Sequence, residues 1–191
     1  MHHKYHTDAI ILSAKNVGES DKIISFFTRE MGVLSAKATG IRKKESKLKY
    51  AIQVGSFARI DLVKGKDIWR LTSATHFPLT ENIFRDHENK KIFMRMLSLI
   101  SRLYRGEDES PHFFDDVVKT IQMLSSFPYK DSEKDFFEIS FVMMILSHLG
   151  YWSDEDKRLP KPYELSITQE MLSNRSIFIS TVNKALKDTQ L

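Results

Sequence analysis

Short runs of apolar residues alternate with polar ones across residues 5–74, and glycine-containing turns separate the runs. The runs typical of strands cover residues 5–13, 22–28, 33–38, 51–54, 56–63 and 68–74. The first of these fits a strand buried on both faces in its middle. A small open sheet would leave unpaired edges, and closing it into a barrel removes them. These runs amount to five or six short strands, and the closed fold that fits them best is a five-stranded OB-fold β-barrel over residues 1–79.

After Pro78 the spacing of apolar residues becomes that of helices, so residues 80–191 are predicted to form a helical domain. Thr80 is expected to cap a first short helix. Longer helices are predicted over about 88–104, 111–126 and 135–149, and a last one from about 168 or 174 to 187. A polar, proline-containing connector, 153–164, precedes the last helix. The expected fold class is α+β with more than one domain.

Charge is distributed unevenly along this pattern. Residues 1–80 hold 14 Lys and Arg against 7 Asp and Glu, whereas residues 81–191 hold 15 against 18. The excess is concentrated in the basic segment, residues 37–49 (KATGIRKKESKLK), which lies between two predicted strands. Lysine and arginine beside a phosphate release condensed counterions, so this segment predicts contact with a nucleic-acid backbone. A solvated, lysine-rich connector is the alternative reading.

Candidate DNA-binding residues follow from this placement. The cations are Lys37, Arg42, Lys43, Lys44, Lys47 and Lys49, with Lys66 and Arg70 near the last predicted strand. Tyr50 and Trp69 are candidates for stacking on bases, although burial in the barrel is an alternative for each. Phe26 and Phe27 are adjacent on one predicted strand and must point to opposite faces, so one belongs to the core and the other is free to stack.

Several classes of site find no support in the sequence. With no cysteine, disulfides and cysteine-based zinc sites are excluded. Neither a phosphate-binding GxxxxGK[ST] motif nor an HExxH motif occurs, and the histidines in the body of the chain stand singly. We therefore expect a binding protein, not an enzyme, with no metal and no cofactor. No apolar run is long enough to span a bilayer, and the first residues lack a signal-peptide core, so a cytoplasmic protein is expected.

The N-terminal residues form a recognisable combination. It consists of Asp8-Ala9-Ile10, of Gly18 to Asp21 and of Phe27 to Glu30 with Gly32. It continues through Ala38, Gly40, Arg42-Lys43, Ser46 to Leu48, Gln53, Lys64-Gly65 and Leu71 to Ala74. This combination resembles the RecO family of bacterial recombination mediators. The helical remainder is similar only in its layout.

The resemblance implies an OB barrel, binding of single- and double-stranded DNA, and annealing of complementary strands. It also implies loading of a recombinase onto DNA coated by single-strand-binding protein, together with a RecR-like partner. Many family members carry a four-cysteine zinc module where this chain has the 153–164 connector without cysteine.

Two further hypotheses concern partners. Lys90, Lys91, Arg95 and Arg102, together with the apolar helices, are predicted to form a groove for the acidic, apolar tail of single-strand-binding protein. The alternative function is a non-catalytic OB-fold adaptor that binds RNA or protein. Such an adaptor would prefer structured RNA and would not anneal DNA.

Overall fold

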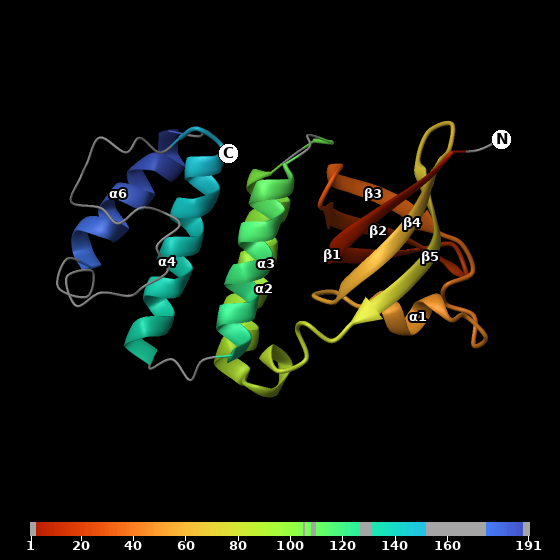
Figure 1. Ribbon diagram of the computed structural model, residues 1–191, viewed down its shortest axis with the longest axis horizontal. Coiled ribbons are helices and arrows are strands. Elements are labelled where there is room, and N and C mark those ends of the chain that lie inside the picture. Colours follow the sequence, from red (N-terminus) through yellow and green to blue (C-terminus); the bar gives the residue numbers. More distant parts are fainter. Residues whose placement is uncertain (1–2, 105, 108–109, 127–130, 152–174, 189–191) are drawn as a thin grey trace.

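The computed structural model describes residues 3–104, 106–107, 110–126, 131–151 and 175–188. A closed five-stranded barrel lies beside a set of helices (Figure 1). The strands are β1 (Lys4–Val17), β2 (Asp21–Thr28), β3 (Gly32–Ala38), β4 (Phe57–Lys64) and β5 (Trp69–Phe77). The prediction of an α+β chain with an OB-type barrel ahead of its helices is confirmed.

The barrel closes in the order β1-β2-β3-β5-β4, and β4 pairs back onto β1. All neighbouring strands are antiparallel except β3 and β5, which are parallel. The long β1 serves both sides, because its first half pairs with β4 and its second half with β2. An irregularity between Ile11 and Ser13 marks the bend between the two halves. Closure leaves no long unpaired edge on the barrel strands.

The strand predicted over residues 51–54 is wrong. Residues Leu48–Ala51 form the short helix α1, and the Ile52 amide donates to the Leu48 carbonyl at 3.1 Å. Ala51 and Ile52 are nevertheless buried in the barrel core, where α1 packs near β5. The apolar run closes one end of the barrel instead of adding a strand. Short apolar runs do not distinguish the two cases by periodicity.

The helices follow in the order η1 (Ile83–Arg85), α2 (His87–Leu103), α3 (Pro111–Ser126), α4 (Asp131–His148) and α6 (Arg175–Asp188). The three central predictions are confirmed, and the last helix is confirmed over its described part. The connector 153–164 and the earlier start at 168 lie outside the described residues. None of the described helices is long and apolar enough to cross a membrane.

The cap predicted at Thr80 is also wrong. The Thr80 side chain is buried, and its carbonyl accepts the Ile83 amide at 3.1 Å in a single 3₁₀ turn. Asp86 caps the first long helix instead, because its carboxylate accepts the Asn89 amide at 2.7 Å. The chain needs this tight turn to pass from the barrel to α2, as Figure 1 shows below the two parts.

Two hydrophobic cores meet at β1 and β2. Ala9 and Ile11 face the barrel interior, whereas Ile10 belongs to the core that the barrel shares with the helices. Phe26 and Phe27 divide in the same way, with Phe26 inside the barrel and Phe27 against the helices. Successive strand residues point to opposite faces, so one strand can serve both cores. The barrel and helices therefore share a continuous apolar interior.

Polar contacts also join the barrel to α3 and to the segment before it. Arg29 forms a bidentate ion pair with Asp115 of α3, with both nitrogen–oxygen distances 2.9 Å. Arg29 holds the pKa of Asp115 below its ordinary value. The Val33 amide donates to the Gly106 carbonyl at 2.9 Å, and the two residues form an isolated antiparallel bridge beside β3. These contacts fix the orientation of the helices on the barrel.

Candidate nucleic-acid interface

The basic segment leaves β3, turns at Gly40 and reaches α1 at the lower end of the barrel in Figure 1. Gly40 has a positive φ of 66°, which glycine adopts without steric cost. The turn sends the following residues back past the β1–β2 connection.

Asp21, at the start of β2, holds the first part of the basic segment. One of its carboxylate oxygens accepts the Gly40 amide at 2.8 Å, and the other lies 3.0 Å from the Lys37 ammonium. The hydrogen bond from the Gly40 amide is the main reason that the pKa of Asp21 lies below its ordinary value, and Lys37 lowers it further. The partners of Asp21 lie far along the chain, and spacing alone gives no sign of them.

Arg42 is held by the same connection. Its amide donates to the Ser20 carbonyl at 3.0 Å, and its guanidinium donates to the Gly18 carbonyl at 3.1 Å. Lys37 and Arg42 therefore already have an ion-pair or hydrogen-bond partner within the protein. Both anchor the segment and retain positive charge beside it.

The remaining cations of the segment are differently placed. Lys43, Lys44, Lys47 and Lys49 are exposed, and none forms an ion pair with another described residue. Four ammonium groups thus lie within seven consecutive residues, and Glu45 is the one acidic residue in that stretch. Phosphate contacts by lysine and arginine are the main source of sequence-independent affinity for nucleic acid. This arrangement suits a polyanion.

The other predicted cations adjoin the segment. β3 and β5 pair with Lys37 beside Arg70, and Arg70 is exposed. Lys66 is exposed in the turn that connects β4 to β5. The parallel β3–β5 pair thus brings Arg70 next to the start of the basic segment.

The aromatic residues predicted to stack on bases differ in their exposure to solvent. Tyr50 on α1 is 74% exposed, so its ring is available to a ligand. Trp69 is only 7% exposed and donates its indole N–H to the Glu107 carboxylate at 3.0 Å. Phe26 and Phe27 are both buried. This placement argues against stacking by Trp69, Phe26 or Phe27, because their rings fill cores.

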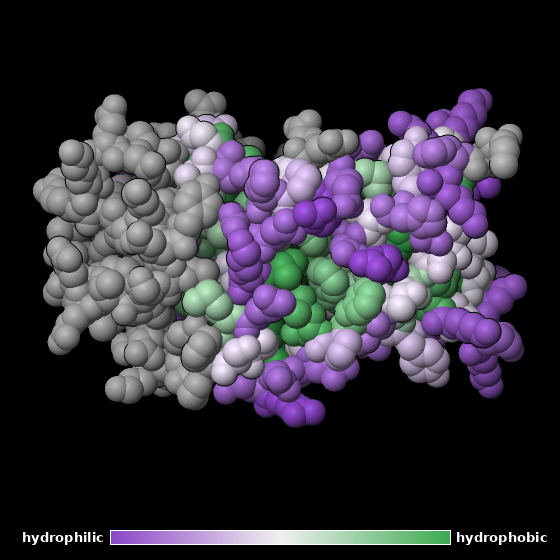
Figure 2. Space-filling model, in the orientation of Figure 1, coloured by the Kyte–Doolittle hydropathy of each residue, from purple (hydrophilic) through white to green (hydrophobic). Residues whose placement is uncertain are grey.

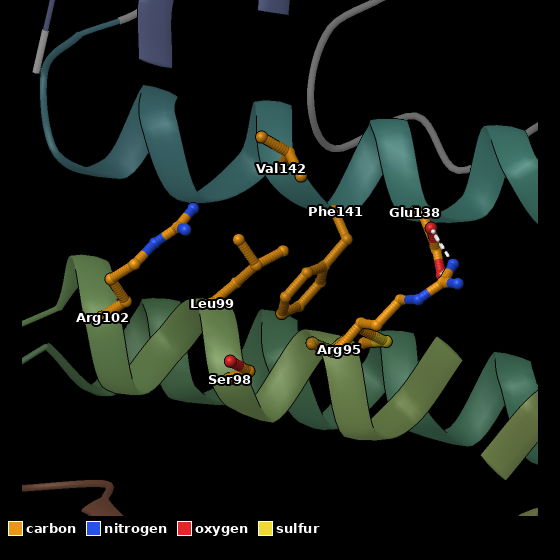
Figure 3. Close-up of a pocket in the computed structure, with 8 residues that line it drawn as sticks. Arg95, Ser98, Leu99, Arg102, Glu138, Phe141 and Val142 are labelled. Atoms are coloured by element: carbon orange, nitrogen blue, oxygen red, sulfur yellow. Dashed lines mark hydrogen bonds and ion pairs between the residues drawn. The ribbon is translucent and has the colours of Figure 1, made fainter. Parts of the chain in front are cut away.

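The helices carry a groove of about 260 Å³ between α2 and α4 (Figure 3). Leu99, Phe141 and Val142 line its apolar floor, and Arg95 and Arg102 flank it. Arg95 is paired with Glu138, at 2.8 Å. The structure thus brings two of the four predicted partner-binding cations together at an apolar groove.

Lys90 and Lys91 do not line this groove. The Lys90 ammonium lies 5.9 Å from the centre of the Phe84 ring, and Lys91 pairs with Glu88 at 3.6 Å. The prediction of one site formed by all four cations does not match this geometry. Lys91 and Arg95 are four residues apart and so lie on the same side of the helix, but they pair with different carboxylates, Glu88 and Glu138.

Within the part of the chain that the structure describes, no group of three or more His, Asp or Glu residues could hold a metal ion. His6 is paired with Asp61 at 2.6 Å, and His148 lies 2.6 Å from the Ser110 hydroxyl. Both histidines therefore have hydrogen-bond partners within the protein.

Known proteins with similar sequences show to which family the barrel is related. Residues 1–77 match the family described as "Recombination protein O N terminal". The chain is 28% identical over 147 residues to the DNA repair protein RecO of Heliobacterium modesticaldum, covering 77% of this chain and 52% of that protein. It is 24% identical to the DNA repair protein RecO of Desulfitobacterium hafniense, with the same coverage.

A third relative, the DNA repair protein RecO of Dehalococcoides mccartyi, is 25% identical over 142 residues, which cover 74% of this chain and 56% of that protein. The chain thus spans about half the length of the curated relatives it matches. These similarities include the whole barrel, the basic segment and part of the helices. On these grounds residues 1–77 are identified as a RecO N-terminal domain, and the chain is similar over about three quarters of its length to DNA repair proteins of the RecO family.

Proposed function

We propose that this protein is a DNA repair and recombination mediator that binds single- and double-stranded DNA and anneals complementary strands. In this proposal it also helps to load a recombinase onto DNA coated by single-strand-binding protein, with a RecR-like partner. Binding and annealing need no catalytic step, in keeping with a family of mediators. The observation that supports the proposal most directly is the set of four exposed, unpaired lysines on the barrel.

The arrangement of these lysines suits annealing. Contacts to phosphates are independent of sequence, so the basic segment would bind any strand and reduce the repulsion between two of them. Asp21 anchors the segment near its start, through the Gly40 amide and the Lys37 ammonium. Exposed Tyr50 follows directly and offers a ring to an unpaired base.

Binding of a labelled single-stranded oligonucleotide across a salt series tests the DNA-binding part. If five phosphates are engaged, the slope of log affinity against log salt is about −3 to −4. Replacing Lys43, Lys44, Lys47 and Lys49 with alanine is expected to reduce the slope by about 3. The matched control replaces Lys91, Lys119, Lys184 and Lys187, four exposed lysines on the helices, with the same loss of charge.

Equal losses in the two variants would mean that net charge alone matters, and the proposal for the basic segment would fail. Competition with structured RNA separates the alternative adaptor function. An adaptor directed at RNA would release the DNA strand to such a competitor, whereas a DNA mediator retains it.

The α2–α4 groove supports a partner site within the same proposal. An acidic, apolar tail of single-strand-binding protein would place apolar side chains on Leu99 and Val142, which are partly exposed, and carboxylates on the flanking arginines. Charge complementarity at such a site requires a carboxylate of the tail to compete with Glu138 for Arg95.

Tail-peptide binding tests this site. The double variant Arg95→Ala, Arg102→Ala is expected to lose affinity, whereas Lys90→Ala, Lys91→Ala is expected to keep it. Both variants lose two positive charges from the same helix, so only position differs. A loss confined to the lysine variant would contradict the groove, whereas losses in both variants would support the prediction of one site formed by all four cations.

A further inference from the structure

A second pocket, of about 320 Å³, lies where α1 meets the turn that leads into the helices. Tyr50, Gln53, Thr80, Glu81 and Phe84 are among the residues that line it. Its volume is at the small end of the range of about 300–1,000 Å³ found for small-molecule sites. It begins one residue after Lys49, so it continues the basic segment toward the helices.

Two aromatic rings border this pocket and remain accessible. Tyr50 is 74% exposed and Phe84 is 40% exposed. Phe84 is held in place, because it packs edge-to-face on Phe93 with ring centres 6.0 Å apart. Gly55 makes room for it, since a Cβ there would lie 2.9 Å from the Phe84 ring and 2.8 Å from Phe93. A fixed ring and a free ring at one pocket suit a flat aromatic ligand.

Polar groups also line the pocket. Thr80 is 2% exposed and lies in the lining, so its hydroxyl is a group with which a ligand there can exchange a hydrogen bond. The Gln53 amide and the Glu81 carboxylate add both donor and acceptor capacity to the lining.

Charge decides which part of a nucleotide this pocket suits. Its lining holds the Glu81 carboxylate and no lysine or arginine, so a phosphate is disfavoured inside it. Cations lie on either side instead. Lys47 and Lys49 precede Tyr50, and the Lys90 ammonium lies 5.9 Å from the centre of the Phe84 ring. Phosphates therefore suit the flanks and an uncharged ring suits the pocket.

We propose that this pocket holds one unpaired nucleobase of a DNA strand that runs from the basic segment toward α2. This inference rests on the proposed binding of single-stranded DNA and adds the position where a base leaves the strand. The base stacks on Tyr50 or Phe84 and exchanges hydrogen bonds with Thr80 and its polar neighbours. Holding a base outside the strand in this way leaves adjacent bases available to pair with a complementary strand.

Equilibrium binding of a labelled oligo(dC) at fixed salt tests the pocket. Tyr50→Ala is expected to weaken binding about 5- to 100-fold, the usual effect of losing one stacking ring, and to leave the salt slope unchanged. Tyr50→Trp is expected to restore binding. Thr80→Val, which keeps the shape of the side chain, is expected to weaken binding several-fold. Tyr151→Ala is the control, because Tyr151 is another exposed tyrosine and does not line the pocket.

A direct readout comes from 2-aminopurine placed within the strand. Stacking on a tyrosine quenches its fluorescence, so the wild-type protein is expected to quench it and Tyr50→Ala to lose the quenching. Wild-type affinity in both Tyr50→Ala and Thr80→Val would overturn the pocket and leave the basic segment as the binding site. No binding of DNA by the wild-type protein at low salt would overturn the proposed function and the pocket together.

Discussion

Truncation of Phe27 tests whether the barrel and the helices unfold as one unit. Phe27 is 1% exposed and projects from β2 toward the helices. Its ring centre lies 5.7 Å from that of Tyr104, 5.5 Å from that of Phe113 and 5.2 Å from that of Phe114. No other strand residue has ring contacts with three aromatic residues of the helical part among those described.

The expected cost follows from this burial. Replacing a buried phenylalanine with alanine lowers the free energy of unfolding by about 3–5 kcal/mol, through lost transfer energy and a residual cavity. The three aromatic contacts place Phe27→Ala at the upper end of that range. A domain of this kind has a total stability of about 5–15 kcal/mol, so Phe27→Leu provides a milder variant that remains folded.

Urea denaturation measures the effect with two probes. A Trp152→Phe background leaves Trp69 as the only tryptophan, so its fluorescence reports on the barrel, while circular dichroism reports on the helices. The continuous core predicts one transition with the same midpoint for both probes, shifted by Phe27→Leu. Phe26→Leu, inside the barrel, is the comparison at an equally buried neighbour.

Two separate transitions, with the barrel midpoint unchanged in Phe27→Leu, would refute the shared core. The two parts would then be independent folding units in contact. The predicted boundary at residues 79 and 80 would describe folding as well as sequence.

Three other predictions concern single residues. Gly55→Ala is expected to lower the free energy of unfolding by about 1–3 kcal/mol in thermal or urea unfolding, because Gly55 has a φ of 84° and a Cβ would meet two aromatic rings. Gly18→Ala shares the positive φ, at 59°, but has open space, so the difference between the two variants measures the clash with the rings. Asp21→Ala is expected to weaken DNA binding several-fold without unfolding the protein, since it releases Gly40; unchanged affinity would show that the anchor is dispensable. Burial lowers the pKa of His148 in the folded protein. As pH falls below the ordinary value of 6.5, the unfolded chain therefore takes up the proton first, and the free energy of unfolding is expected to decrease. His148→Gln is expected to remove this decrease.

The barrel could be predicted from sequence because its strands have period-two patterning and glycine turns that depend on local residues. Phe26 and Phe27 illustrate the limit of that reasoning. Their opposite orientations follow from strand geometry, but the cover over the outer face comes from helices distant in sequence. The same limit applies to Trp69, whose burial and bond to Glu107 depend on the segment between α2 and α3.

The candidate site shows the same division. The lysines of the basic segment are visible in the sequence because they lie within a few residues of one another, in a polar stretch between two strands. The anchor at Asp21 and the pocket beside Tyr50 depend on tertiary contacts between residues far apart in the chain. Residues 51–54 were predicted as a strand because an apolar run that closes a barrel end has the same composition.

Strand annealing tests the central claim most directly. Two complementary labelled oligonucleotides are mixed with and without the protein, in a salt series and without ATP. The account predicts faster annealing that fades with salt and is lost when Arg42, Lys43, Lys44 and Lys47 are replaced with alanine. Annealing that is no faster with the protein than without it, at low salt, would contradict the account.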